Sequence, residues 1–218
     1  DLTIKLWNPE TGELRRTLTG HTKFIRSIKF SPDGYTLVSS SWDKTVKVWN
    51  WQTGELLRTI QEQAGIFAVA VSPNGRSIAT ASKDDTIKLW DLQTGVRIRT
   101  LVGHQDSVRT VAFSPDGQQL ASGSNDQTIK LWNLSTGELI RTLEGHTGLV
   151  NSVAFNSDQT ALLSGSEDAT VKLWSLHDLN QSHTFFEPSQ GIHAVTFSGD
   201  GKTFIGAGKD NKVRIWRH

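Results

Sequence analysis

The sequence predicts an all-β protein in which one small antiparallel sheet is repeated along the chain. The first observation is a strand-like motif, Thr-Ile-Lys-Leu-Trp or a close variant, which recurs throughout the 218 residues. The second is its spacing, because successive copies lie 41 or 42 residues apart. The third is the set of Gly- and Pro-containing turns that separate short apolar runs between the copies. The tryptophans of the motif are Trp7, Trp49, Trp90, Trp132, Trp174 and Trp216.

A period of about 40 to 45 residues is typical of a β-propeller. Each repeat of a propeller forms one small sheet, or blade, which must stack on its neighbours because it cannot bury its faces alone. We number the repeats 1 to 5 by the tryptophans that close them, from Trp49 to Trp216. Each repeat is expected to form one blade.

Repeat 3, over residues 107–142, shows the expected order of strands within a blade. The first apolar run ends at Phe113, and Ser114-Pro115-Asp116-Gly117 follows it. Proline at the second turn position fixes φ at about −65° and glycine at the fourth accepts unusual dihedral angles, so these residues predict a tight turn. The second strand spans 120–124, the third 128–132, and a fourth, 138–143, follows a Thr-Gly pair. The pattern predicts four antiparallel strands per blade.

Three Gly-His pairs give the repeats a resemblance to a known family. The histidines are His21, His104 and His146, each 28 residues before a closing tryptophan. The whole chain, residues 1–218, resembles WD repeats of the regular bacterial type, although only Trp90-Asp91 is a literal Trp-Asp pair.

The two ends of the chain suggest how much of a ring it contains. The first seven residues are expected to be a lone third strand, whereas the chain stops just after the last tryptophan. Because the family usually has seven blades, we expect five blades plus an N-terminal strand remnant, part of a seven-bladed or larger ring. The upstream part would then be missing, and this chain would be a C-terminal fragment. A closed five-bladed ring is the alternative.

The amino-acid composition favours no charged class of partner and excludes several kinds of reactive site. There are 23 Lys and Arg against 22 Asp and Glu, so no strong field attracts nucleic acid or a membrane surface. The absence of cysteine excludes disulfides, thiolate zinc sites and cysteine nucleophiles. We expect no cofactor and a cytoplasmic location. The arginines of the outer strands are interpreted as a solvated edge that opposes aggregation; they are Arg15, Arg16, Arg58, Arg97, Arg99 and Arg141.

His, Ser, Asp and Trp occur in a fixed order in three repeats, which at first resembles a hydrolase triad. A catalytic triad needs one accessible copy, whereas this set recurs. The family resemblance implies instead a buried hydrogen-bond chain that satisfies the indole N–H. The residues are His21, Ser39, Asp43 and Trp49; His104, Ser122, Asp126 and Trp132; and His146, Ser164, Asp168 and Trp174.

Repeats 2 and 5 depart from this pattern. In repeat 2 the Gly-His position reads Gln61-Glu62, so Thr80, Asp84 and Trp90 lack a histidine. In repeat 5 that position reads Glu187-Pro188, and Gly206 replaces the serine. Before it, a metal site of His177, Asp178 and His183 is conceivable, but the spacing fits no zinc pattern and favours a surface loop.

The resemblance also implies which side chains touch a partner, on the face where the inner strands begin. They are Phe24, Arg26, Trp42, Phe67, Lys83, Arg109 and Asn125, with Gly65 and Ser107 at matching positions. Trp42 is the most informative, because its counterparts in the other repeats are all polar. An aromatic cluster flanked by arginines suggests a partner with a carboxylate or phosphate beside an apolar anchor. Alternatively, Trp42 folds over a neighbouring loop and Phe24 packs under the blade.

The favoured function is a non-enzymatic scaffold that binds proteins on its loop faces. The alternative is a sensor or regulatory region of a larger signalling protein, such as a kinase or NTPase fusion. An enzyme with its site in the channel is disfavoured, because the expected starts of the inner strands carry no acidic residue.

Overall fold

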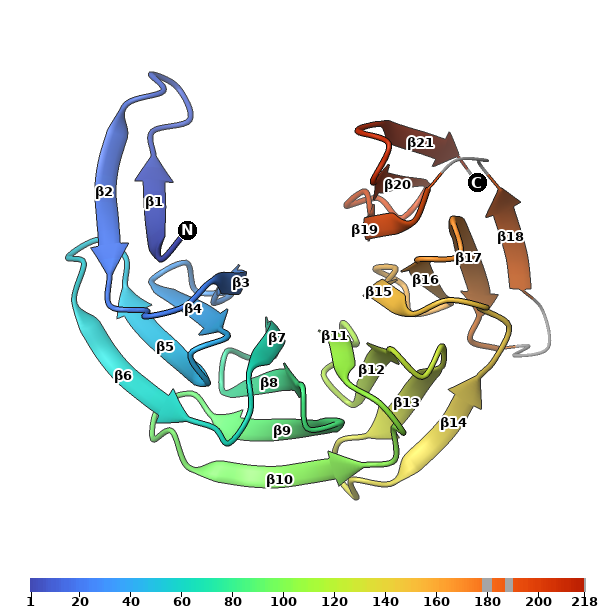
Figure 1. Cartoon of the computed structure of the whole chain (residues 1–218), viewed down its shortest axis with the longest axis horizontal. Coiled ribbons are helices and arrows are strands. Elements are labelled where there is room, and N and C mark those ends of the chain that lie inside the picture. The colour runs from blue at the N-terminus through green and yellow to red at the C-terminus, as the bar shows by residue number, and fades with distance from the viewer. Residues whose placement is uncertain (178–181, 187–189, 218) are drawn as a thin grey trace.

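The computed structural model, which describes residues 1–177, 182–186 and 190–217, contains only strands as regular elements in these ranges. They form six antiparallel sheets that follow one another around an open arc (Figure 1). The prediction of an all-β propeller of antiparallel blades is confirmed. We call the sheets that contain repeats 1 to 5 blades 1 to 5.

The first three blades each have four strands. Blade 1 contains β3 (Ile25–Phe30), β4 (Thr36–Ser41), β5 (Thr45–Asn50) and β6 (Leu56–Gln61). Blade 2 contains β7 (Ile66–Val71), β8 (Ser77–Ser82), β9 (Thr86–Asp91) and β10 (Arg97–Val102). Blade 3 contains β11 (Val108–Phe113), β12 (Gln119–Ser124), β13 (Ile129–Asn133) and β14 (Leu139–Leu143).

The remaining sheets complete the arc. Blade 4 contains β15 (Val150–Phe155), β16 (Ala161–Ser166), β17 (Thr170–Ser175) and β18 (Ser182–Phe186). Blade 5 has three described strands, β19 (Ile192–Phe197), β20 (Thr203–Gly208) and β21 (Val213–Arg217). The N-terminal remnant is a pair, because β1 (Thr3–Trp7) lies beside β2 (Leu14–Thr19).

The first strand of each blade lines the inside of the arc, and the outer strands form its rim (Figure 1). The tight turns between the first two strands have the expected geometry: in blade 1, Gly34 has φ +73° and donates its N–H to the carbonyl of Ser31. Only a residue that tolerates positive φ fits this position without strain.

The core lies between neighbouring blades, as stacking requires. Ala79 and Leu89 of blade 2 pack with Val108, Leu120 and Trp132 of blade 3 in one buried cluster. The indole of Trp132 is almost fully buried. Each closing tryptophan of blades 1 to 4 is buried in the same way, so every blade depends on its neighbour for part of its hydrophobic stabilisation.

Two of the outer-strand arginines do more than form a solvated edge. Arg58 on β6 donates hydrogen bonds to the carbonyls of Gln93 and Thr94, in the turn of the next blade. Arg99 on β10 binds the carbonyls of Ser135 and Thr136 in the same manner. Both side chains are half-buried, and the interpretation of all six arginines as a solvated edge is wrong for these two. The physical reason is that stacking brings the next Thr-Gly turn within reach of a guanidinium.

Candidate functional site

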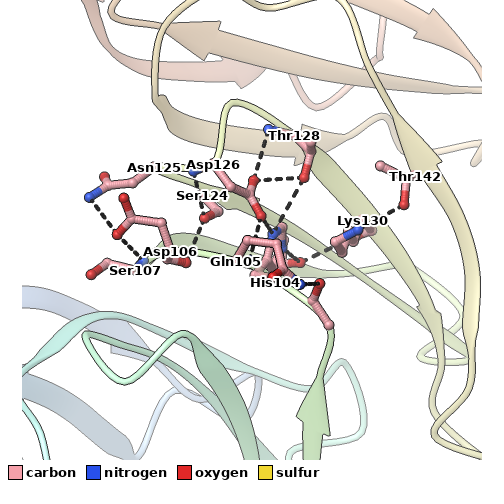
Figure 2. Close-up of polar contacts among 12 residues, drawn as sticks. His104, Gln105, Asp106, Ser107, Ser124, Asn125, Asp126, Thr128, Lys130 and Thr142 are labelled. Atoms are coloured by element: carbon pink, nitrogen blue, oxygen red, sulfur yellow. Dashed lines mark hydrogen bonds and ion pairs between the residues drawn. The ribbon is translucent and has the colours of Figure 1, made fainter.

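A buried hydrogen-bond chain runs through the end of blade 3. His104 Nδ1 lies 2.7 Å from Asp126 Oδ2, and its Nε2 lies 2.8 Å from Ser122 Oγ. The indole N–H of Trp132 donates to the same hydroxyl at 2.9 Å. Since a carboxylate only accepts, Nδ1 of His104 carries the proton. Figure 2 shows the polar contacts that surround His104 and Asp126.

Blades 1 and 4 repeat this geometry. In blade 1, His21 lies 2.7 Å from both Asp43 Oδ2 and Ser39 Oγ, and the indole of Trp49 donates to Ser39 at 2.9 Å. In blade 4 the corresponding distances are 2.8, 2.7 and 2.8 Å, among His146, Asp168, Ser164 and Trp174. The three serines are fully buried. A substrate carbonyl could not approach them, so the arrangement supports folding and gives no nucleophile.

The aspartates of these chains are held in their charged form. Burial alone would raise the pKa of Asp126, but hydrogen bonds from His104, the Gln105 N–H and Thr128 outweigh it and keep the pKa below the ordinary value of 3.8. The same balance lowers the pKa of Asp168, with hydrogen bonds from His146, Thr170 and the Thr147 N–H. For His21, burial lowers the pKa below 6.5 although Asp43 favours the charged ring.

Blade 2 replaces the histidine with a buried ion pair. The hydroxyl of Thr80 donates to Glu62 Oε1 at 2.5 Å and accepts the Trp90 indole N–H at 3.2 Å. Lys88 Nζ lies 3.0 Å from Glu62 Oε2 and 2.7 Å from Asp84 Oδ2. Glu62 therefore occupies the place of the histidine in the chain, while Lys88 provides the positive charge between the two carboxylates.

Blade 5 keeps only part of the pattern. Gly206 leaves room for the ring of Trp216, which stacks on Phe204 at a centroid distance of 5.5 Å. Asp210 pairs with Arg214 at 2.5 Å. Glu187, Pro188 and Asp178 lie outside the described residues. Over the described part of the chain, no group of three His, Cys, Asp or Glu side chains is placed to hold a metal ion.

The face where the inner strands begin carries an aromatic cluster that bridges blades 1 and 2. Trp42 lies edge-on to Phe24, with ring centroids 6.1 Å apart, and edge-on to Phe67 at 6.2 Å. Trp42 is 40% exposed and Phe24 57% exposed. Phe67, the second residue of the inner strand of blade 2, is half-buried. Trp42 also rests against Gly65, so it partly covers the neighbouring loop and still presents ring surface.

Two guanidiniums lie over these rings. Arg26 is 5.1 Å from the ring centre of Trp42, and Arg109 is 4.6 Å from that of Phe67. Both distances fit cation–π contacts. Burial and the nearby charge of Arg26 lower the pKa of Arg109, although its guanidinium stays charged at any ordinary pH.

The other sequence-derived positions lie around this cluster. Asn125 accepts a 2.6 Å hydrogen bond from Arg109 Nε and thereby fixes the guanidinium. Ser107 is buried and donates to the carbonyl of Lys83, whereas the Lys83 side chain is exposed. The structure thus brings together aromatic side chains of blades 1 and 2 with arginines of blades 1 and 3.

A groove of about 440 Å³ lies beside Trp42. Its lining includes several residues that the sequence reasoning missed: Lys23, Lys44, Gln63 and Ala64. In the sequence these residues are marked only by their neighbours: Lys23 precedes Phe24, Lys44 lies in the tight turn after Trp42, and Gln63 and Ala64 precede Gly65. Spacing within one repeat does not show which side chains two neighbouring blades turn toward each other.

Comparison with known proteins identifies the repeat. The family model described as WD domain, G-beta repeat, matches residues 12–50, 54–91, 95–133, 137–175 and 179–217. The chain belongs to the WD40 repeat family. WD40 proteins generally act as protein-interaction scaffolds and are typically not enzymes. No described helix is long and apolar enough to cross a membrane.

The alignments with curated relatives are each about as long as one WD40 repeat. The chain is 49% identical over 41 residues to nuclear distribution protein PAC1 of Gibberella zeae, which is 18% of this chain and 9% of the relative. It is 44% identical over 39 residues to the protein of the same name from Mycosarcoma maydis, with the same coverage. A third relative is the periodic tryptophan protein 2 homolog of Neurospora crassa, 44% identical over 41 residues, 19% of this chain and 5% of the relative. The chain therefore spans less than a tenth of the length of these relatives.

Proposed function

We propose that this WD40 chain is a non-enzymatic interaction scaffold that holds a protein partner on the face where its inner strands begin. One observation carries the proposal: the partly exposed indole of Trp42 lies between two other aromatic rings and beneath a guanidinium. Large aromatic and Arg side chains contribute most of the energy of typical protein interfaces.

The position of Trp42 supports a binding role over a packing role. The closing tryptophans, which pack the core, are buried in blades 1 to 4. Trp42 instead occupies a position where the other blades carry Lys83, Asn125, Glu167 and Lys209. A tryptophan that no shared packing function requires, exposed beside Phe24, forms the kind of patch that marks interaction sites.

Selection of peptides from a phage-displayed random library tests the proposal. The immobilised 218-residue chain is used for selection, and the binders are then measured on Trp42→Ala and Tyr35→Ala. Tyr35 is an exposed aromatic residue next to the turn at the opposite end of the strands of blade 1, so it is a matched control. We expect binders that lose affinity on Trp42→Ala and keep it on Tyr35→Ala. Binders whose affinity is unchanged by Trp42→Ala, with folding of the variant verified by circular dichroism, would place the binding site elsewhere.

The more specific alternative, a sensor or regulatory region of a larger signalling protein, stays a prediction from the sequence, as does a cytoplasmic location.

A further inference from the structure

The groove beside Trp42 has an unbalanced charge. It is lined by Lys23, Trp42, Lys44, Gln63, Ala64, Gly65, Phe67 and Lys83, which include no acidic residue. The three lysines are exposed. Within the described ranges, none of them forms an ion pair.

The arginines above the aromatic rings extend this positive surface. Arg26 and Arg109 stack on the two rings that border the groove. The side-chain partner of Arg109 Nε is the neutral amide of Asn125, and the carboxylates of Glu167 and Asp106 lie near enough to interact with its charge. Three lysines therefore line the groove around a short apolar floor made by Trp42 and Phe67, and two arginines lie over the same two rings.

We propose that this groove binds an acidic peptide segment of a partner protein. An apolar side chain of the peptide would pack between Trp42 and Phe67, and neighbouring Asp or Glu carboxylates would face the lysines and the arginines. This inference rests on the proposed function, and it specifies the chemistry of the partner.

The size of the groove favours a peptide over a nucleic acid. A cavity of about 440 Å³ accommodates one or two side chains. Binding of single-stranded nucleic acid uses a longer positive track with successive aromatic platforms. The chain as a whole has a formal charge of only +1, so the positive surface is local.

The sequences of the Trp42-dependent phage peptides give the first test. We expect them to be enriched in Asp and Glu beside a large apolar residue. A synthetic peptide with the strongest such sequence is then compared with its Glu→Gln and Asp→Asn counterpart by fluorescence anisotropy. The neutral counterpart should bind about tenfold more weakly, and the affinity of the acidic peptide should fall as NaCl is added.

Variants of the protein give the second test. The triple variant Lys23→Gln, Lys44→Gln, Lys83→Gln should weaken binding of the acidic peptide about tenfold, as expected for several exposed charge pairs. Lys202→Gln, an exposed lysine in blade 5, is the control and should leave binding unchanged. The melting temperatures of all variants are compared with that of the wild type.

Three outcomes would overturn the inference. Trp42-dependent peptides that are neutral or basic would refute it and leave the proposed function intact. Equal binding by a short oligothymidylate, lost on Trp42→Ala, would show a general polyanion site. Absence of any Trp42-dependent peptide would refute both the inference and the proposed function.

Discussion

Each buried histidine of blades 1, 3 and 4 satisfies two polar groups at once. His104 joins the carboxylate of Asp126 to the hydroxyl that accepts the Trp132 indole N–H. Without the imidazole, both neighbours would lose a partner in a place that water does not reach. The cost of an unsatisfied buried group exceeds the net gain of one ordinary hydrogen bond.

His104→Ala should therefore lower the free energy of unfolding by about 1 to 3 kcal/mol. Urea denaturation followed by tryptophan fluorescence measures the change. His193→Ala removes an exposed histidine of blade 5 and should shift the free energy by less than about 0.5 kcal/mol. Equal effects of the two substitutions would contradict a structural role for the chain.

The stability of the protein should also fall as the pH is lowered. The pKa of His21 in the folded state lies below its ordinary value of 6.5, so the unfolded chain takes up this proton first. Its contribution is complete above about pH 6.5 and is lost on acidification. Asp126 and Asp168, whose folded pKa values lie below 3.8, add a second loss below about pH 4.

Urea unfolding at a series of pH values measures this dependence, and His21→Asn should flatten the part that begins just below pH 6.5. A free energy of unfolding that is unchanged from about pH 7 to about pH 5 in the wild type would contradict the assignment.

At the scale of the strands, blade 2 completes its buried hydrogen-bond chain with charged side chains, whereas blades 1, 3 and 4 complete theirs with a histidine. The side chain of Glu62 is fully buried and that of Lys88 nearly so. Lys88 lies between Glu62 and Asp84, so its removal would leave two carboxylates without a cation, whereas removal of the Glu62 charge would leave Lys88 paired with Asp84.

Lys88→Met, which leaves both Glu62 and Asp84 without a cation, should thus reduce the free energy of unfolding by about 3 kcal/mol, whereas Glu62→Gln, after which Lys88 keeps Asp84, should cost about 1 kcal/mol. The side-chain amide oxygen that this substitution introduces can still accept the hydroxyl of Thr80, so the substitution isolates the charge. Thermal and urea unfolding of both variants give the comparison. A Lys88→Met variant that is no less stable than Glu62→Gln would contradict the role of Lys88 between the two carboxylates.

The arginine contacts between blades permit a related prediction. Arg58→Ala removes the hydrogen bonds from β6 to the Thr-Gly turn of blade 2, where Gly95 leaves space for the side chain of Arg58. We expect a loss of about 1 kcal/mol in the free energy of unfolding. Arg97→Ala, on the exposed start of β10, is the control and should have little effect.

Much of this organisation was predictable from the sequence, because strand alternation and turn residues depend on neighbours in the chain. The spacing of the tryptophans and the tight turn of Ser114 to Gly117 predicted the blades directly. The contact of Arg58 with a turn of the following repeat was not predictable, since it depends on how two sheets stack. For the same reason the sequence indicated Trp42 and Phe67 separately but not that they meet.

At the scale of the whole molecule, the sheets at the two ends of the arc have fewer described strands than the four-stranded blades between them. In the described part of the chain, β21 pairs only with β20 and β1 only with β2. Val213 and Ile215 on β21 are 67% and 65% exposed, and Trp7 on β1 is 55% exposed. Exposed apolar edge strands are templates for pairing with another chain.

The isolated 218-residue chain should therefore self-associate. Sedimentation velocity at increasing protein concentration is expected to show growing amounts of dimer or larger species. Val213→Lys with Ile215→Lys should reduce the association, because charge on an edge strand opposes pairing. A monomer with sharp, concentration-independent unfolding would contradict this prediction and favour a closed ring.

The bridge formed by Trp42 has a mechanical consequence. Trp42 belongs to blade 1 and Phe67 to blade 2, so anything held between them is attached to two units that otherwise meet along a single seam. A bound partner would hold blades 1 and 2 together, and local separation of the two blades would first require the partner to dissociate. Occupancy of the face would then slow amide hydrogen exchange along the whole length of β7, the strand that carries Phe67 and lies against blade 1.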